Sequence, residues 1–178
     1  VSVSSFGPGV ALVTRGKNKG IEMIDRDGNV KCALNEVVGK SVDMAMPLWL
    51  VSSEEFSFSP FVVFWADKKV GCMDAEGRVV IPPEYSWITY SGKYLMAFKE
   101  GDITKMDRVN LLNLLTLEAY ITEDGDTLRT CIFDRVGNRL RTFTTVGESM
   151  TGWFSEEIIY VGKYTDEKLR CELRTLDN

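Results

Sequence analysis

No histidine occurs in the 178 residues of this chain, and it has neither closely spaced cysteine pairs nor long apolar runs. Without histidine, the Ser-His and Cys-His nucleophile systems are excluded, together with every metal site that uses an imidazole. No apolar run reaches the roughly 18 residues of a membrane-spanning helix, so membrane insertion is not expected. No targeting segment is recognisable, and a cell-surface or periplasmic location would require a leader ahead of Val1. Compartment and oligomeric state stay open.

An excess of basic residues is also missing. The chain has 21 Lys and Arg against 26 Asp and Glu, a formal charge of −5 that is spread over both halves. Nucleic acid and anionic membranes are therefore not expected as partners. Aromatic residues make up 11% of the chain, which supplies enough large apolar side chains to expect an ordered globular domain.

Cysteine is sparse, and no two of the four cysteines show the spacing of a zinc knuckle or redox motif. The sequence instead predicts small buried hydrophobic residues at all four positions, because free cysteine is among the most buried residue types. No metal or other cofactor is expected. These residues are Cys32, Cys72, Cys131 and Cys171.

A repeated Asp-x-x-Gly phrase is the main positive signal. In such a phrase the aspartate accepts a hydrogen bond from the backbone two residues on, and glycine or asparagine takes the left-handed conformation that closes a hairpin. Flanks rich in Val, Ile, Phe and Thr, often alternating, predict antiparallel strands on either side. We assign a structural turn role to four pairs of residues: Asp25 and Gly28, Asp74 and Gly77, Asp107 and Asn110, and Asp134 and Gly137.

The repeats predict an all-β fold in one domain, built from irregular units of antiparallel strands. Two arrangements stay open, a propeller-like ring and an open array of β-hairpins. Residues 1–4 are expected to pair with the last unit, which would remove two open edges. The approximate units are residues 1–39, 56–91, 92–118, 119–150 and 151–178, with an insertion over 40–55.

Residues 70–85, VGCMDAEGRVVIPPEY, resemble the WG-repeat family of β repeats. The family has a Trp-Gly dipeptide at the start of this phrase, and Val70 stands in the position of its tryptophan. Residues 6–13, FGPGVALV, resemble the strand that precedes the dipeptide in the family. The resemblance covers most of the chain and is strong for two units. It implies a bacterial surface or interaction module without shared catalytic residues.

Two stretches have helical character. Residues 109–120 are leucine-rich; the repeat register favours a strand there, and a helix is the alternative. Residues 34–38 are a second, short helical candidate.

Catalytic and metal-binding candidates all have simpler interpretations. Asp25 opens a stretch that resembles a calcium loop, but Val30 stands where that loop needs glycine, so a hairpin turn is favoured. The neighbouring carboxylates of each Glu-Glu dipeptide point to opposite faces of a strand. Ser91 and Lys93 do not form a Ser-x-x-Lys motif. The dipeptides are residues 54–55 and 156–157, and residues 123–126 form a further acidic cluster, interpreted as a hairpin tip.

The aromatic residues offer the best candidate ligand contacts. Trp65 and Trp153 fall in core-like positions. Trp49 lies in the insertion and Trp87 follows the closing Tyr85, which makes these two the candidates for ligand stacking. The expected function is a non-catalytic binding or interaction module for a protein or glycan. The alternatives are a carboxylate-based hydrolase and a structural spacer of a longer polypeptide.

Overall fold

The computed structural model describes ten stretches of the chain, and it confirms the all-β fold class. Strands make up nearly all of its regular structure, with one short helix. In the part that the structure describes, no helix combines the length and apolar character needed to cross a membrane. The described residues are 2–4, 6–7, 9–15, 20–51, 56–100, 120–121, 127–146, 149–153, 155–165 and 168–176.

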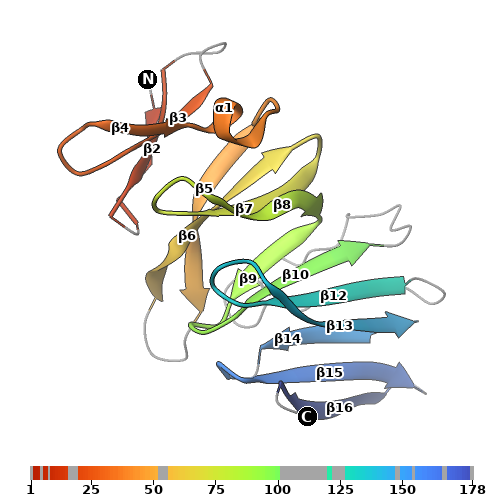
Figure 1. The fold of residues 1–178 in the computed structure, drawn as a ribbon. Coiled ribbons are helices and arrows are strands. Elements are labelled where there is room, and N and C mark those ends of the chain that lie inside the picture. The colour runs from red at the N-terminus through yellow and green to blue at the C-terminus, as the bar shows by residue number, and fades with distance from the viewer. Residues whose placement is uncertain are drawn as a thin grey trace. The chain divides into compact units, whose positions relative to one another are not determined.

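The strands form four antiparallel sheets of four strands each (Figure 1). The first has the order β1-β2-β3-β4, with bounds Ser2–Val3, Ala11–Thr14, Ile21–Ile24 and Val30–Ala33. The second has the order β5-β6-β7-β8, with bounds Met44–Val51, Phe56–Ala66, Lys69–Asp74 and Val79–Tyr85. The third has the order β13-β12-β10-β9, with bounds Arg139–Val146, Thr127–Phe133, Leu95–Glu100 and Trp87–Tyr90. The fourth has the order β11-β14-β15-β16, with bounds Tyr120–Ile121, Ser149–Trp153, Ile158–Thr165 and Lys168–Thr175.

The chain divides into two compact units, Val1–Tyr90 and Ser91–Asn178. In the first unit, one hydrophobic cluster joins the first sheet to the second. Leu12 and Met23 contribute from the first sheet, and Phe64 and Met73 from the second. All four are at most 5% exposed, so this cluster is a true core.

In the second unit, the first four residues of strand β10 are fully buried. The four successive residues Leu95, Met96, Ala97 and Phe98 are all 0% exposed. Because successive side chains of a strand point to opposite faces, both faces of this strand are covered.

The short helix predicted at residues 34–38 is confirmed as α1 (Leu34–Val38). Leu34 anchors it in the core at 0% exposed. Gly39 ends it in the left-handed conformation at φ 70°, and its N–H donates to the Asn35 carbonyl. The Asn35 side chain then accepts the Val42 N–H at 2.9 Å, which directs the chain toward β5.

Residues 44–51, which the sequence analysis treats as part of an insertion, form β5, the first strand of the second sheet. Pro47 is accommodated because β5 is an edge strand, and the register shifts between Pro47 and Trp49.

The predicted pairing of residues 1–4 with the last unit is wrong. Strand β1 pairs with β2, with Val3 opposite Val13. Ser4 reinforces this pairing, because its N–H donates to the Leu12 carbonyl and its hydroxyl accepts the Leu12 N–H, both at 2.9 Å. The leucine-rich stretch 109–119 lies outside the described residues, and Tyr120 opens β11.

Candidate functional site

Three hairpin turns share one hydrogen-bond pattern, and each begins with a repeat aspartate. In every case Oδ1 accepts the backbone N–H groups of the second and fourth following residues at 2.8–3.0 Å. The aspartate carbonyl accepts the N–H of the glycine three residues on, and that glycine has a φ of 85–92°. The turns begin at Asp25, Asp74 and Asp134; Asp107 and Asn110 lie outside the described residues.

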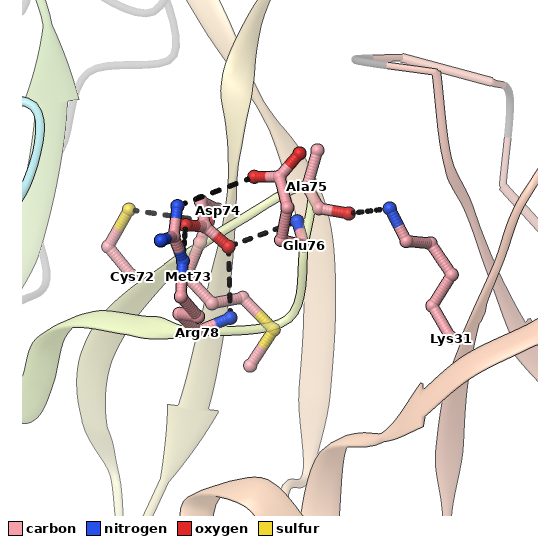
Figure 2. Close-up of polar contacts among 7 residues, drawn as sticks. All are labelled: Lys31, Cys72, Met73, Asp74, Ala75, Glu76 and Arg78. Atoms are coloured by element: carbon pink, nitrogen blue, oxygen red, sulfur yellow. Dashed lines mark hydrogen bonds and ion pairs between the residues drawn. The ribbon is translucent and has the colours of Figure 1, made fainter.

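The second oxygen of each carboxylate is also engaged. Oδ2 accepts the side-chain amide of Asn29 at 3.1 Å in the first turn and that of Asn138 at 2.8 Å in the third. In the second turn it accepts Nε of Arg78 at 2.7 Å (Figure 2). Both oxygens of these aspartates therefore serve their own turns, which supports the turn interpretation over a calcium loop at Asp25.

These hydrogen bonds lower the pKa values of two of the turn aspartates. The Asn29 side chain and the turn N–H groups lower the pKa of Asp25, and burial raises it by less. Burial is the largest single influence on Asp134 and raises its pKa, but the bonds from Asn138 and the turn backbone together outweigh it and leave the pKa lowered. Both groups are ionised at neutral pH, so neither resembles a general acid with a raised pKa.

Figure 2 also shows how the Asp74 turn is tied to the first sheet. Lys31 reaches from β4, and its Nζ donates to the Ala75 carbonyl at 2.6 Å. Gly77 lies so close to β4 that a Cβ built on it would be 2.9 Å from Sγ of Cys32. The turn is thus part of the packing between the two sheets of the first unit.

Ser91, Lys93 and the 156–157 dipeptide come together in the second unit. The Ser91 hydroxyl donates to the Glu156 carbonyl at 3.0 Å and accepts the N–H of Lys93 and of Tyr94. The Lys93 ammonium pairs with Glu157. That ion pair raises the pKa of Lys93. A nucleophile needs a nearby base that can take its proton, and a charged, paired lysine is not one. This cluster fastens a loop and does not resemble a catalytic site.

The remaining polar candidates are not located by the structure. Residues 54–55 and 123–126 lie outside the described residues. Among the described residues, no three acidic or cysteine side chains gather as metal ligands would.

The prediction of buried cysteines is confirmed for two of the three whose side chains the structure describes, and the side chain of Cys171 lies outside the described residues. Cys72 and Cys131 are free and buried, whereas Cys32 is free and only half-buried. Burial raises the pKa of the Cys72 thiol far above its usual value and raises that of Cys32 as well. Neither thiol has the lowered pKa of a reactive cysteine.

The tryptophans supply the best candidate binding surface. Trp87, on β9, is half-buried and packs against Trp65 of β6, with ring centroids 6.0 Å apart and planes inclined at 57°. Met44 lies directly opposite Trp65 in the β5–β6 register, so both side chains lie on one face of the sheet. Met44 is 50% exposed. We call Met44, Trp65 and Trp87 the tryptophan patch.

The other aromatic candidates lie elsewhere. The backbone of Trp49 belongs to β5, and its side chain lies outside the described residues. Trp153 is half-buried at the end of β14. Tyr85 and Tyr90 are buried, and Tyr90 makes an edge-to-face contact with Phe61 at 5.2 Å. Only Trp87 of the two stacking candidates is therefore located, and its partner Trp65 is a residue that the sequence analysis placed in the core.

Comparison with known proteins adds little. No family model and no curated protein matches the chain. One solved structure that resembles it is a crystal structure of a eukaryotic initiation factor, with 11% identity and a TM-score of 0.33. The likeness covers 90% of this chain and 48% of that one, so this chain spans about half the length of its neighbour. A likeness this weak carries no argument about function.

Proposed function

We propose that the chain is a non-catalytic binding module that contacts its ligand through the tryptophan patch. One observation carries this proposal: Met44 and Trp65 of the second sheet and Trp87 of β9 form a partly exposed apolar surface. The resemblance to WG repeats supports the same class of function. A spacer would have no need of such a surface.

The composition of the patch favours a protein ligand. Tryptophan and methionine are enriched at protein interfaces, and methionine adapts to irregular partner surfaces. A glycan is the second candidate, because a sugar ring stacks on an exposed aromatic face. The 57° angle between the rings favours protein, since the two rings do not make one flat platform on which a chain of sugars could lie.

The carboxylates give the hydrolase alternative little support. Glycoside hydrolysis needs two carboxyl groups facing one substrate, one of them with a raised pKa. Asp25 and Asp134 have lowered pKa values, and both oxygens of Asp74 are used within its turn.

Thermal unfolding against a ligand panel tests the proposal. The panel consists of short peptides of varied sequence, chito-oligosaccharides, soluble peptidoglycan fragments and Ca²⁺. EDTA is added after Ca²⁺ to show that any shift caused by the ion is reversible. A ligand present at about 100 times its Kd stabilises the native state by about 2.7 kcal/mol, which raises the Tm by roughly 5–11 °C at this size.

Trp87→Ala is the informative variant. Val79→Ala is its control, because Val79 is an exposed apolar residue of the second sheet, which also holds Met44 and Trp65, and it lies outside the patch. We expect a peptide or glycan to raise the Tm of the parent and of Val79→Ala but not of Trp87→Ala. A ligand that stabilises all three equally would overturn the role of the patch.

A further inference from the structure

A groove of about 410 Å³ lies in the second unit along strands β13 and β16. Each is an edge strand of its sheet, and within the described strands β13 pairs only with β12 and β16 only with β15. An edge strand presents backbone N–H and C=O groups to any extended segment that approaches it. The groove is lined by Phe143, Glu172, Leu173, Arg174 and Thr175.

The lining shows that the groove faces the edge of β16. Four successive residues of that strand line it, from Glu172 to Thr175. Successive side chains point to opposite faces of a sheet, so a surface that meets all four lies along the strand's edge and not on one face. This is the geometry in which a peptide adds a strand to a sheet.

The register identifies which backbone groups are available. The Leu176 N–H donates inward to the Glu157 carbonyl at 3.1 Å, and β15 and β16 continue from there without a register shift. Antiparallel pairs alternate between hydrogen-bonded and non-hydrogen-bonded residues. The N–H groups of Leu173 and Thr175 therefore point away from β15, toward the groove.

The groove offers an apolar anchor beside a charged pair. Leu173 is 54% exposed, and Phe143 stands half-buried on the β13 side. Arg174 donates to Glu172 at 2.8 Å, and the two side chains are 41% and 65% exposed, respectively. An exposed pair of this kind is weak, so its guanidinium can exchange partners at little cost.

The β12–β13 hairpin is basic although the chain as a whole is acidic. Residues 127–146 contain four arginines and one aspartate, a formal charge of +3 in a protein of −5. The single aspartate, Asp134, is committed to its own turn. Three of the arginines are exposed and form no ion pair with another described residue: Arg129, Arg135 and Arg139.

We propose that this groove binds an acidic peptide segment in extended conformation, which pairs with β16 and places an apolar side chain between Phe143 and Leu173. The hairpin arginines attract the acidic side chains. A peptide fits better than a nucleic acid, because the lining has a single aromatic ring on which a base could stack, whereas the strand edge offers backbone groups that pair with an extended peptide. This proposal rests on the chain being a binding module and names a ligand class for a second surface.

Fluorescence anisotropy with the full chain and labelled synthetic peptides tests the proposal. The probe alternates glutamate and leucine, and its counterpart alternates lysine and leucine. We expect the acidic peptide to bind at least about tenfold more tightly than the basic one, and added salt to weaken it. No binding, or equal binding of the two peptides, would overturn the proposal.

Three variants separate its parts. Leu173→Ala removes the apolar anchor, Arg135→Glu with Arg139→Glu reverses the hairpin charge, and Thr175→Pro removes one outward N–H at a position where an edge strand tolerates proline. Each should weaken the acidic peptide by about tenfold, whereas Val30→Ala, at an exposed edge position of β4, should leave it unchanged. Circular dichroism checks that each variant stays folded.

Two outcomes would reassign the groove. Binding of a single-stranded oligonucleotide that the arginine reversal abolishes and Thr175→Pro leaves intact would indicate a nucleic-acid surface. Concentration-dependent dimerisation that Thr175→Pro abolishes would indicate a second copy of the chain. If the acidic peptide fails while another ligand still depends on Trp87, the groove proposal falls and the proposed function stands.

Discussion

Asp74 contacts Arg78 through both of its carboxylate oxygens: Oδ1 accepts the backbone N–H at 2.9 Å and Oδ2 accepts Nε at 2.7 Å. Oδ1 also accepts the Glu76 N–H at 3.0 Å. One side chain therefore closes the β7–β8 turn and satisfies two backbone donors that would otherwise lack partners.

Asp74→Ala should be strongly destabilising. Asp74 is 8% exposed, so its replacement leaves the backbone N–H groups of Glu76 and Arg78 without an acceptor in a partly buried turn. Bonds to charged groups contribute about 1.5–3 kcal/mol each but are not additive, and we expect a loss of about 2–4 kcal/mol in the free energy of unfolding. Urea denaturation measures it. Asp25→Ala, at a more exposed turn with the same hydrogen-bond pattern, is the matched control and should lose less; an equal loss in the two variants would contradict the burial argument.

Stability should fall in acid through the turn aspartates. The pKa values of Asp25 and Asp134 are lowered on folding, so their contribution is fully present above the unfolded value of about 3.9 and is lost as pH falls through the folded values. Carbon-13 NMR titration of the carboxyl groups measures each pKa. Asn29→Ala should move the Asp25 pKa upward and leave that of Asp134 unchanged. If the Asp25 pKa does not move, the Asn29 side chain is not the main cause of its lowering.

Gly77 and Gly28 form a natural comparison. Both have a φ of 85°, so alanine is strained equally at either position, but a Cβ at Gly28 meets nothing within 4 Å whereas one at Gly77 meets Cys32. We expect Gly28→Ala to cost about 1–2 kcal/mol and Gly77→Ala at least about 1 kcal/mol more.

A double-mutant cycle with Cys32→Ala isolates the contact. Removing the sulfur should recover part of the Gly77→Ala loss and none of the Gly28→Ala loss, as measured by urea denaturation. Identical costs at the two glycines would contradict the close packing of the turn on β4.

Lys68→Gly should stabilise the protein. Asp67 and Lys68 both have positive φ, at 53° and 61°, in the tight turn between Ala66 and Lys69. Such a turn favours glycine at its second central position, so the substitution should add about 0.5–1 kcal/mol. Thermal unfolding measures the change. Lys69→Gly, inside a strand, should have the opposite sign, and a loss at Lys68 would indicate a side-chain role for that lysine.

Much of the local structure could be predicted from the sequence because the determinants are local. The Asp-x-x-Gly phrase contains every residue of its turn, and both α1 and its terminator Gly39 lie within six residues. Strand β5 falls in the predicted insertion because residues 40–55 lie in the longest gap between the turn aspartates and match none of the repeat units. Its place is decided by pairing with β6, which sequence periodicity does not show.

The candidate surfaces were harder to predict because they depend on distant residues. Trp65 lies in a continuous apolar run, so alternation could not show which of its residues stays exposed. Its partner Trp87 comes from another strand. The basic hairpin does not show in the charge of the chain's halves, because both halves are acidic and the four arginines lie within 20 residues.

The most direct test of the binding proposal is a two-dimensional NMR titration that follows the indole N–H signals of the four tryptophans. With a peptide or glycan selected from the thermal-unfolding panel, the account predicts that the signals of Trp65 and Trp87 shift together and saturably, while that of Trp153 stays in place and the ligand is recovered unchanged. Shifts that spare both Trp65 and Trp87, or chemical conversion of the ligand during the titration, would contradict it.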